Sequence, residues 1–234
     1  MPEALPPLEI LYEDNHLIAV NKAPGDIVQG DKTGDTPLSE KVKEYLRIKY
    51  QKPGNVFVGV IHRLDRPVSG VVLFAKTGKA LARMNALFAK KDEVTKRYRA
   101  IVEQAPTPPQ GLLRHWLRKN AKQNKSYPTA SGAKEAKEAL LEYKTVGHGD
   151  RYTLLEVTLL TGRHHQIRAQ LSAIGSVIRG DLKYGARRPL PDGSIALHAY
   201  RLTFVHPVSH EVIDITAPYP QSNGDLFRTL SGEI

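Results

Sequence analysis

The sequence contains no cysteine. This absence excludes disulfide bridges, thiolate metal sites and thiol nucleophiles. It fits a protein of a reducing compartment, and we expect the cytoplasm. No run of about 18 apolar residues occurs, so no membrane-spanning helix is predicted. Residues 1–7 lack the basic and apolar regions of a signal peptide and are predicted to form an N-terminal tail.

The sequence also lacks the short motifs that bind common cofactors. It has no Walker lysine loop, no GxGxxG pattern and no evident pair of catalytic carboxylates. The adjacent histidines His164 and His165 do not suit a helical metal site, because such ligands stand about three or four residues apart on one face. We therefore expect neither a metal ion nor a cofactor.

Positive charge exceeds negative charge in this chain. The 234 residues include 34 Lys and Arg against 24 Asp and Glu, a net charge of +10. Such a chain typically binds a polyanion, although a merely soluble basic protein can share this composition. Charge alone does not separate RNA from DNA or anionic lipid. No basic amphipathic helix with a large apolar face is evident, which argues against a membrane surface. No exposed apolar stripe is obvious either, so we expect a monomer.

The densest group of functional residue types is the run His62-Arg63-Leu64-Asp65-Arg66-Pro67-Val68-Ser69-Gly70. Pro67 excludes a helix at this point, and Gly70 permits a sharp exit. The apolar residues 71–75 follow and are typical of a buried strand. Asp65 is thus predicted on a rigid loop, where nearby positive charge keeps its carboxylate ionised. It is either a nucleophile or half of a structural ion pair.

A second cluster is Thr161-Gly162-Arg163-His164-His165-Gln166-Ile167-Arg168. We predict a turn and a helix over residues 162–174. In that helix Arg168 would lie one turn beyond His164, on the same face. The helix start would favour an anion. The cluster could bind a phosphate or hold an acid, and the alternative is a helix start that carries a surface arginine.

Periodicity predicts an α+β fold: a mixed, largely antiparallel central β-sheet with flanking helices and loops. We predict a single domain over residues 1–234, with a C-terminal tail over 219–234. Further helices are predicted over residues 36–49, with Thr36 at the N-cap, and 79–91. Strands are predicted over 8–20 (one or two), 56–61, 71–75, 96–103 and 152–160, and short strands or turns over 176–184, 197–205 and 211–217.

Residues 105–149 are predicted to be a basic, irregular segment. Trp116 and Tyr127 lie between its many lysines and arginines, a mixture that suits an RNA-facing surface. A solvated hairpin is the alternative interpretation.

Six segments together resemble the RluA-type RNA pseudouridine synthases. They occur in the family's order over about residues 8 to 218, and six patterns in order are far more specific than any one. The 62–70 run resembles HRLD-x-x-T/S-S/T-G, and 161–168 resembles TGRTHQIR. The others are 14–22 for the opening strand pair, 96–98 for K-x-Y, 180–185 for GD-x-x-YG, and 197–199 with 204–207 for LHA…F-x-HP.

The resemblance implies the pseudouridine synthase fold, in which the helices and loops that flank the sheet surround a catalytic cleft. It also implies roles for matching residues. Asp65 would be the catalytic acid, and Arg168 would pair with it and hold it ionised. Tyr98 would stack on the target base and assist proton removal from C5. Arg63 would occupy the space left by the flipped nucleotide. The residues predicted to bind substrate or RNA are His62, Arg63, Arg66, Arg163, His165, Gln166, Lys119, Lys122 and Lys125.

The chain departs from the family pattern at three positions. Val68 and His164 stand where Thr or Ser is usual, and Ala23 replaces a common proline. We expect too few residues before Leu8 for the separate S4-type RNA-binding domain of many relatives. Recognition would then come from the catalytic domain, its basic segment or RNA shape.

The sequence thus predicts a cytoplasmic RNA pseudouridine synthase that isomerises a specific uridine in tRNA or ribosomal RNA without a cofactor. One alternative is a catalytically silent RNA-binding protein on the same fold. Another is a glycoside hydrolase or nucleosidase. That class would normally need a second carboxylate, and it leaves the basic charge unexplained.

Overall fold

The computed structural model describes residues 6–31, 33–90 and 93–233. The chain divides into two compact units, where we predicted one domain. The first is Met1–Val94 with Arg201–Pro218, and the second is Thr95–Tyr200 with Tyr219–Ile234. The predicted tail over residues 1–7 falls largely on residues 1–5, which lie outside the described part. Within the described residues, no helix is long and apolar enough to cross a membrane.

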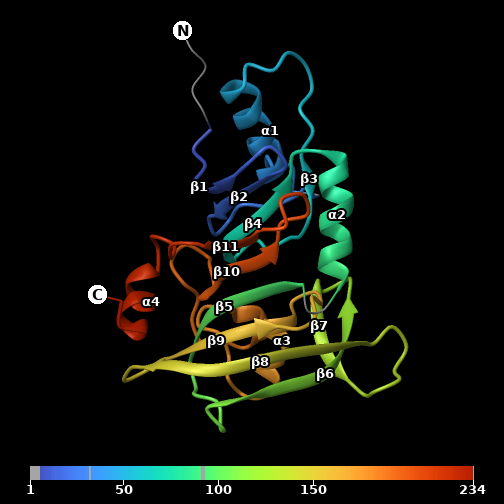
Figure 1. Cartoon of the computed structure of the whole chain (residues 1–234). Coiled ribbons are helices and arrows are strands. Elements are labelled where there is room, and N and C mark those ends of the chain that lie inside the picture. The colour runs from blue at the N-terminus through green and yellow to red at the C-terminus, as the bar shows by residue number, and fades with distance from the viewer. Residues whose placement is uncertain (1–5, 32, 91–92, 234) are drawn as a thin grey trace. The chain divides into compact units, whose positions relative to one another are not determined.

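The first unit is built on a sheet whose strands follow the order β1-β2-β4-β10, and β3 and β11 pair with β4 and β10 (Figure 1). A hairpin at Asp14 begins this sheet, because the Asp14 carboxylate accepts the backbone N–H groups of His16 and Leu17. Only Arg201–Val205 of β10 belongs to this unit. The strands are β1 (Ile10–Glu13), β2 (Leu17–Lys22), β3 (Gly59–Val60), β4 (Ser69–Ala75), β10 (Leu197–Val205) and β11 (Val212–Thr216).

Two helices belong to the first unit. The N-cap of α1 (Leu38–Lys49) is Pro37, not the predicted Thr36, and backbone carbonyls of Ile27 and Val28 accept its first N–H groups. Helix α2 (Gly78–Ala89) begins after Thr77, whose hydroxyl accepts the N–H of Ala80. The predicted end of this helix at residue 91 lies outside the described residues.

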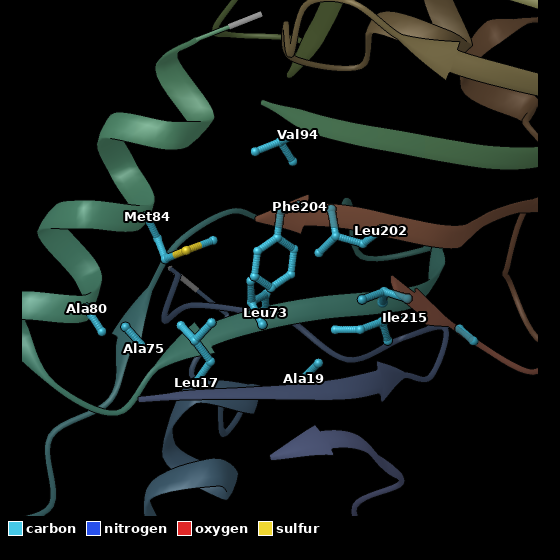
Figure 2. Packing of buried hydrophobic residues seen from close by; sticks show 12 residues of the cluster. Leu17, Ala19, Leu73, Ala75, Ala80, Met84, Val94, Leu202, Phe204 and Ile215 are labelled. Carbon is cyan, nitrogen blue, oxygen red and sulfur yellow. The ribbon is translucent and has the colours of Figure 1, made fainter. Parts of the chain in front are cut away.

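The core of the first unit fixes the strand that follows Asp65. Leu73 of β4 and Leu17 of β2 are fully buried, and Met84 of α2 and Phe204 of β10 belong to the same cluster (Figure 2).

The predicted strand over 56–61 is shorter than expected, because only Gly59 and Val60 pair with β4. Leu81 packs against Gly59 so closely that a Cβ there would lie 2.8 Å from one of its methyl carbons.

The second unit contains an antiparallel sheet of order β5-β9-β8-β6-β7. Three of these strands cover most of residues 105–149, so the prediction of an irregular segment is wrong and the hairpin alternative describes it better. Ala169 of α3 packs against Leu117 of β6 and Ala139 of β8. The elements are β5 (Val94–Val102), β6 (Gln110–Asn120), β7 (Lys125–Thr129), β8 (Lys137–His148), β9 (Thr153–Leu159) and α3 (Gln166–Ala173).

One prediction near the C-terminus needs correction. Residues 219–234 include helix α4 (Gly224–Ser231) instead of a tail. The helix packs on β8 at Gly147, where a Cβ would lie 1.8 Å from the carbonyl oxygen of Leu230. Residues 176–184, predicted to form short strands or turns, contain a bridge at Ile178 and the 3₁₀ turn η1 (Leu182–Tyr184).

Candidate active site

Asp65 lies on a tight turn in the first unit, immediately before β4. The N–H of Val68 donates to the Asp65 carbonyl oxygen at 3.0 Å, which closes the turn. The Asp65 side chain is half-buried. A carboxylate on a short turn at a strand end has little backbone freedom, as the position of Pro67 predicted.

Lys22, the last residue of β2, forms hydrogen bonds to the backbone of this turn. Its side chain is 1% exposed, and its ammonium donates to the carbonyl oxygens of Arg66 at 3.0 Å and Val68 at 2.6 Å. A third bond reaches the carbonyl of Ala23. Burial lowers the pKa of Lys22 to about 7, although the nearby carboxylates of Asp26 and Asp65 oppose this shift. Lys22 therefore fixes the backbone directly after Asp65.

The other predicted residues of this run have distinct surroundings. The His62 ring stacks on Phe88, and its Nε2 accepts the N–H of Leu73, so His62 ties the loop to β4. Arg63 is exposed. Arg66 is also exposed and forms an ion pair with Asp35.

In the second unit, Arg168 of α3 forms a buried pair with Asp181. Its Nε and Nη2 donate to the two carboxylate oxygens at 2.7 and 2.8 Å, and the side chains are 6% and 1% exposed. The guanidinium also lies over the ring of Tyr184, 5.1 Å from the centroid. Bidentate pairing sets both the position and the plane of an arginine.

His165 adds a third contact to Arg168. Nη1 of Arg168 lies 3.2 Å from Nε2 of His165, and Tyr184 Oη lies 3.1 Å from Nδ1. Because arginine can only donate, Nε2 is the acceptor and Nδ1 carries the proton of a neutral ring. Burial, and then the positive charge of Arg168, lower the pKa of His165 to about 2. His165 is thus a neutral link between Tyr184 and Arg168.

The turn and the helix predicted over residues 162–174 are both present, but the helix starts after the turn and not next to Gly162. His165 has a left-handed backbone (φ 53°), and α3 starts at Gln166. His164 therefore lies before the helix, and the prediction that it shares a helix face with Arg168 is wrong. Its ring instead stacks on His165, with 3.8 Å between the centroids.

Two further residues of this cluster contribute to the turn before α3. The Gln166 side chain is buried; its oxygen accepts from Thr161 and from the N–H of Arg163, and its nitrogen donates to a backbone carbonyl. The exposed Arg163 donates to the carbonyl of Glu138. Their predicted roles in RNA binding stay predictions.

Tyr98 lies in the middle of β5, opposite Val157 of β9, and is 9% exposed. Tyr98 and Arg168 belong to the second unit and Asp65 to the first.

The lysines predicted to bind RNA also belong to the second unit. Lys119 and Lys122 are exposed, and Lys125 lies over the rings of Tyr127 and Tyr184.

Sequence reasoning missed Lys22, Asp181 and Tyr184 as parts of the site. All three stand in segments that carry the family resemblance, but no role was assigned to them. The available signals were a lysine at the end of a strand that begins with four apolar residues, and an acid directly after Gly180. Among the described residues, no group of three or more His, Asp or Glu side chains is placed to hold a metal ion.

Comparison with known proteins defines the class. Residues 16–173 match the family model described as RNA pseudouridylate synthase. Ribosomal large subunit pseudouridine synthase D of Zymomonas mobilis is 33% identical, over 96% of this chain and 73% of the relative. The protein of the same name in Vibrio cholerae is 32% identical, over 96% and 71%.

Solved structures agree on the fold. The human RNA pseudouridylate synthase domain-containing protein 4 superimposes with a TM-score of 0.77 at 22% identity, covering 94% of this chain and 92% of that one. The human domain-containing protein 1 gives 0.72 at 24% identity, covering 94% and 86%. The predicted α+β fold is confirmed. The chain belongs to the RNA pseudouridylate synthase family, a class of isomerases, as its resemblance to the RluA-type enzymes predicted.

Proposed function

We propose that this protein converts a specific uridine of structured RNA to pseudouridine, with Asp65 as the nucleophile and without a cofactor. Ribosomal RNA of the large subunit is the first candidate substrate, because two of the relatives are named for it. Transfer RNA is the second. We further propose that the two units act as one catalytic domain, and that the protein works as a monomer in the cytoplasm.

The reaction exchanges one bond of the ribose for another. The Asp65 carboxylate either attacks C1′ as uracil leaves through N1, or removes the 2′ proton to give a glycal. The uracil then turns within the site and C5 bonds to C1′. On the covalent route the Asp65–C1′ ester bond breaks as this bond forms, and on the glycal route C2′ regains its proton from Asp65. The proton on C5 is then lost, and N1 of the product carries a proton. Atoms balance without an oxidant, a reductant or a metal.

The other residues support these steps in the proposed site. Arg168 pairs with Asp65 and keeps it ionised, since a neighbouring cation favours the carboxylate. Tyr98 stacks on the uracil so that it turns without escaping, and assists removal of the C5 proton. Arg63 fills the space of the extruded nucleotide, which offsets part of the few kcal/mol that flipping costs.

The backbone that carries Asp65 gives the proposal its main support. Lys22 bonds the carbonyls of Arg66 and Val68, and the Val68 N–H bonds the carbonyl of Asp65. A partly exposed carboxylate on a backbone fixed at this many points suits attack on one atom of a bound substrate, because misplacement by about 1 Å can cost about a hundredfold in rate.

Tritium release tests the proposal. Unmodified large-subunit ribosomal RNA and tRNA transcripts labelled at C5 of uridine would be incubated with the wild type, Asp65→Asn and Asp65→Ala. Asp150→Asn, which changes an exposed acid, serves as the matched control. We expect release by the wild type and the control alone, with RNA affinity retained in Asp65→Asn.

Two other results of the tritium assay would contradict the proposal. Comparable release by Asp65→Asn would refute Asp65 as the nucleophile. Binding without release from any transcript by the wild type would favour a silent RNA-binding protein instead.

A further inference from the structure

The end of the β6–β7 hairpin extends beyond the strand that supports its base. The register of β6 with β8 ends at Leu117, whereas β6 and β7 continue to pair as far as Asn120 and Lys125. An isolated two-stranded hairpin is marginally stable. The position of residues 118–127, here called the hairpin tip, therefore depends on contacts outside the sheet.

His164 supplies two such contacts. Its Nδ1 lies 2.9 Å from Ser126 Oγ, and its Nε2 lies 3.1 Å from Asn124 Oδ1. Because an amide oxygen can only accept, Nε2 donates to Asn124 Oδ1, while Nδ1 and the Ser126 hydroxyl share the second hydrogen bond. One imidazole thus bonds both the turn and the first part of β7.

Tyr184 bonds the same part of the tip through its hydroxyl. Its oxygen accepts the N–H of Ser126 at 2.9 Å and donates to the carbonyl of Ser126 at 3.1 Å. The remaining lone pair accepts from His165 Nδ1. Lys183 also donates to the carbonyl of Asn124 at 3.2 Å. The tip is therefore joined to the residues that surround Arg168.

The tip is strongly basic. Residues 110–134 contain no Asp or Glu, and the tip itself carries Arg118, Lys119, Lys122 and Lys125. Cations on a fixed support lose less conformational entropy on binding than cations on a mobile loop. A fixed basic tip beside Arg168 suits the phosphates of a structured RNA.

We propose that His164 is a positioning residue that docks the hairpin tip against the start of α3, so that the lysines of the tip contact RNA phosphates. The proposal rests on the proposed function. It predicts that His164 affects RNA affinity more than the chemical step, since it touches the hairpin and the stacked ring of His165.

Ring-retaining and bond-retaining variants test the role. His164→Phe keeps an aromatic ring over His165 but removes both hydrogen bonds to the tip, whereas His164→Gln keeps one donor and one acceptor. His210→Asn is the control, because His210 is exposed on the first unit and asparagine tolerates its positive φ. Tyr184→Phe removes the second set of bonds to the tip.

Two measurements are made on each variant. One is kcat and KM on a C5-labelled transcript at several salt concentrations. The other is hydrogen exchange of the amides of residues 118–127, which requires no activity. For His164→Phe we expect KM to rise about tenfold, kcat to stay within about twofold, and exchange to accelerate within the tip alone. His164→Gln should recover part of both effects, and Tyr184→Phe should accelerate the same amides.

Unchanged exchange and KM in His164→Phe would overturn the proposal. So would a loss of kcat at constant KM, because it would place His164 in the chemistry. If no transcript is a substrate, the proposed function fails. Exchange and binding to an unmodified tRNA transcript then still decide whether His164 docks a basic tip that binds RNA.

Discussion

The guanidinium of Arg168 and the carboxylate of Asp181 meet through two parallel hydrogen bonds of 2.7 and 2.8 Å in the interior of the second unit. Asp181 follows Gly180, whose backbone has φ +86° and whose missing Cβ leaves space for Leu190 and the Ser194 carbonyl. The glycine thus lets the chain turn so that the acid faces α3. Asp181 orients the arginine that we propose acts on Asp65.

Asp181→Asn should weaken both folding and catalysis. The variant leaves a buried guanidinium beside a neutral amide, and breaking a buried ion pair in this way typically costs about 3–5 kcal/mol. Urea unfolding should report that loss, and tritium release should show kcat reduced at least about tenfold, since Arg168 is no longer held in one plane. Asp150→Asn provides the control for loss of one exposed charge. Wild-type values for Asp181→Asn in both assays would contradict the positioning role.

The lysines of the hairpin should determine the salt dependence of RNA binding. Replacement of Lys119, Lys122 and Lys125 by alanine should raise KM and reduce the slope of log affinity against log salt by roughly 2 to 3. Binding of one transcript would be measured between roughly 50 and 200 mM KCl. The control replaces Lys79, Arg83 and Lys90 of the α2 segment, which removes the same charge elsewhere. An equal effect of both triple variants would show that net charge, not the hairpin, determines binding.

Local patterns predicted much of the fold. Residues 197–205, predicted to form a short strand or turn, are strand β10 with the same bounds, and the strand predicted over residues 152–160 contains β9. These segments alternate or run apolar because one or both of their faces are buried, and burial is the property that periodicity records. The turn at Asp65 followed from Pro67 and Gly70, whose backbone preferences act within a few residues.

Long-range partners could not be predicted in this way. Lys22 bonds a carbonyl 46 residues away, and Arg168 bonds an acid 13 residues away across a turn. Nothing in the spacing of either pair shows that they meet, since the meeting depends on how strands and helices pack. The left-handed backbone of His165 also has no local signal, and it places the helix start at Gln166 instead of next to Gly162.

The ionised carboxylate of Glu13 should stabilise the fold at neutral pH, and this stabilisation should be lost in acid. Its carboxylate accepts from Lys49, Lys76 and Tyr50, and the side chain is 8% exposed. Burial raises the pKa of Glu13, but these hydrogen bonds outweigh it and lower the pKa to about 2, from an ordinary value of 4.5. Because the folded pKa is the lower one, the stabilisation is present above pH 4.5 and is lost as pH falls toward 2.

Glu13→Gln should therefore lower the free energy of unfolding at pH 7 by about 1–3 kcal/mol. Its unfolding free energy should also change less between pH 4.5 and 2 than that of the wild type. Urea titrations at a series of pH values measure both effects. Glu211→Gln is the comparison, because Glu211 is an exposed acid of the same unit. Parallel pH profiles for Glu13→Gln and the wild type would refute the assignment.

Lys22→Met should show whether the hydrogen bonds from Lys22 keep the Asp65 turn in its position. Methionine fills much of the same buried volume but cannot donate to the carbonyls of Arg66 and Val68, so the turn loses its support from β2. Unfolding should become easier by about 1–3 kcal/mol, because buried acceptors lose a charged donor. The turn can then shift, and a shift of about 1 Å in a nucleophile would reduce kcat by about a hundredfold.

Lys79→Met, on the exposed side of α2, should leave both the stability and kcat unchanged. Tritium release at saturating RNA, measured beside urea unfolding, distinguishes the two effects. A stable Lys22→Met variant with wild-type kcat would show that the turn keeps Asp65 in place without this lysine.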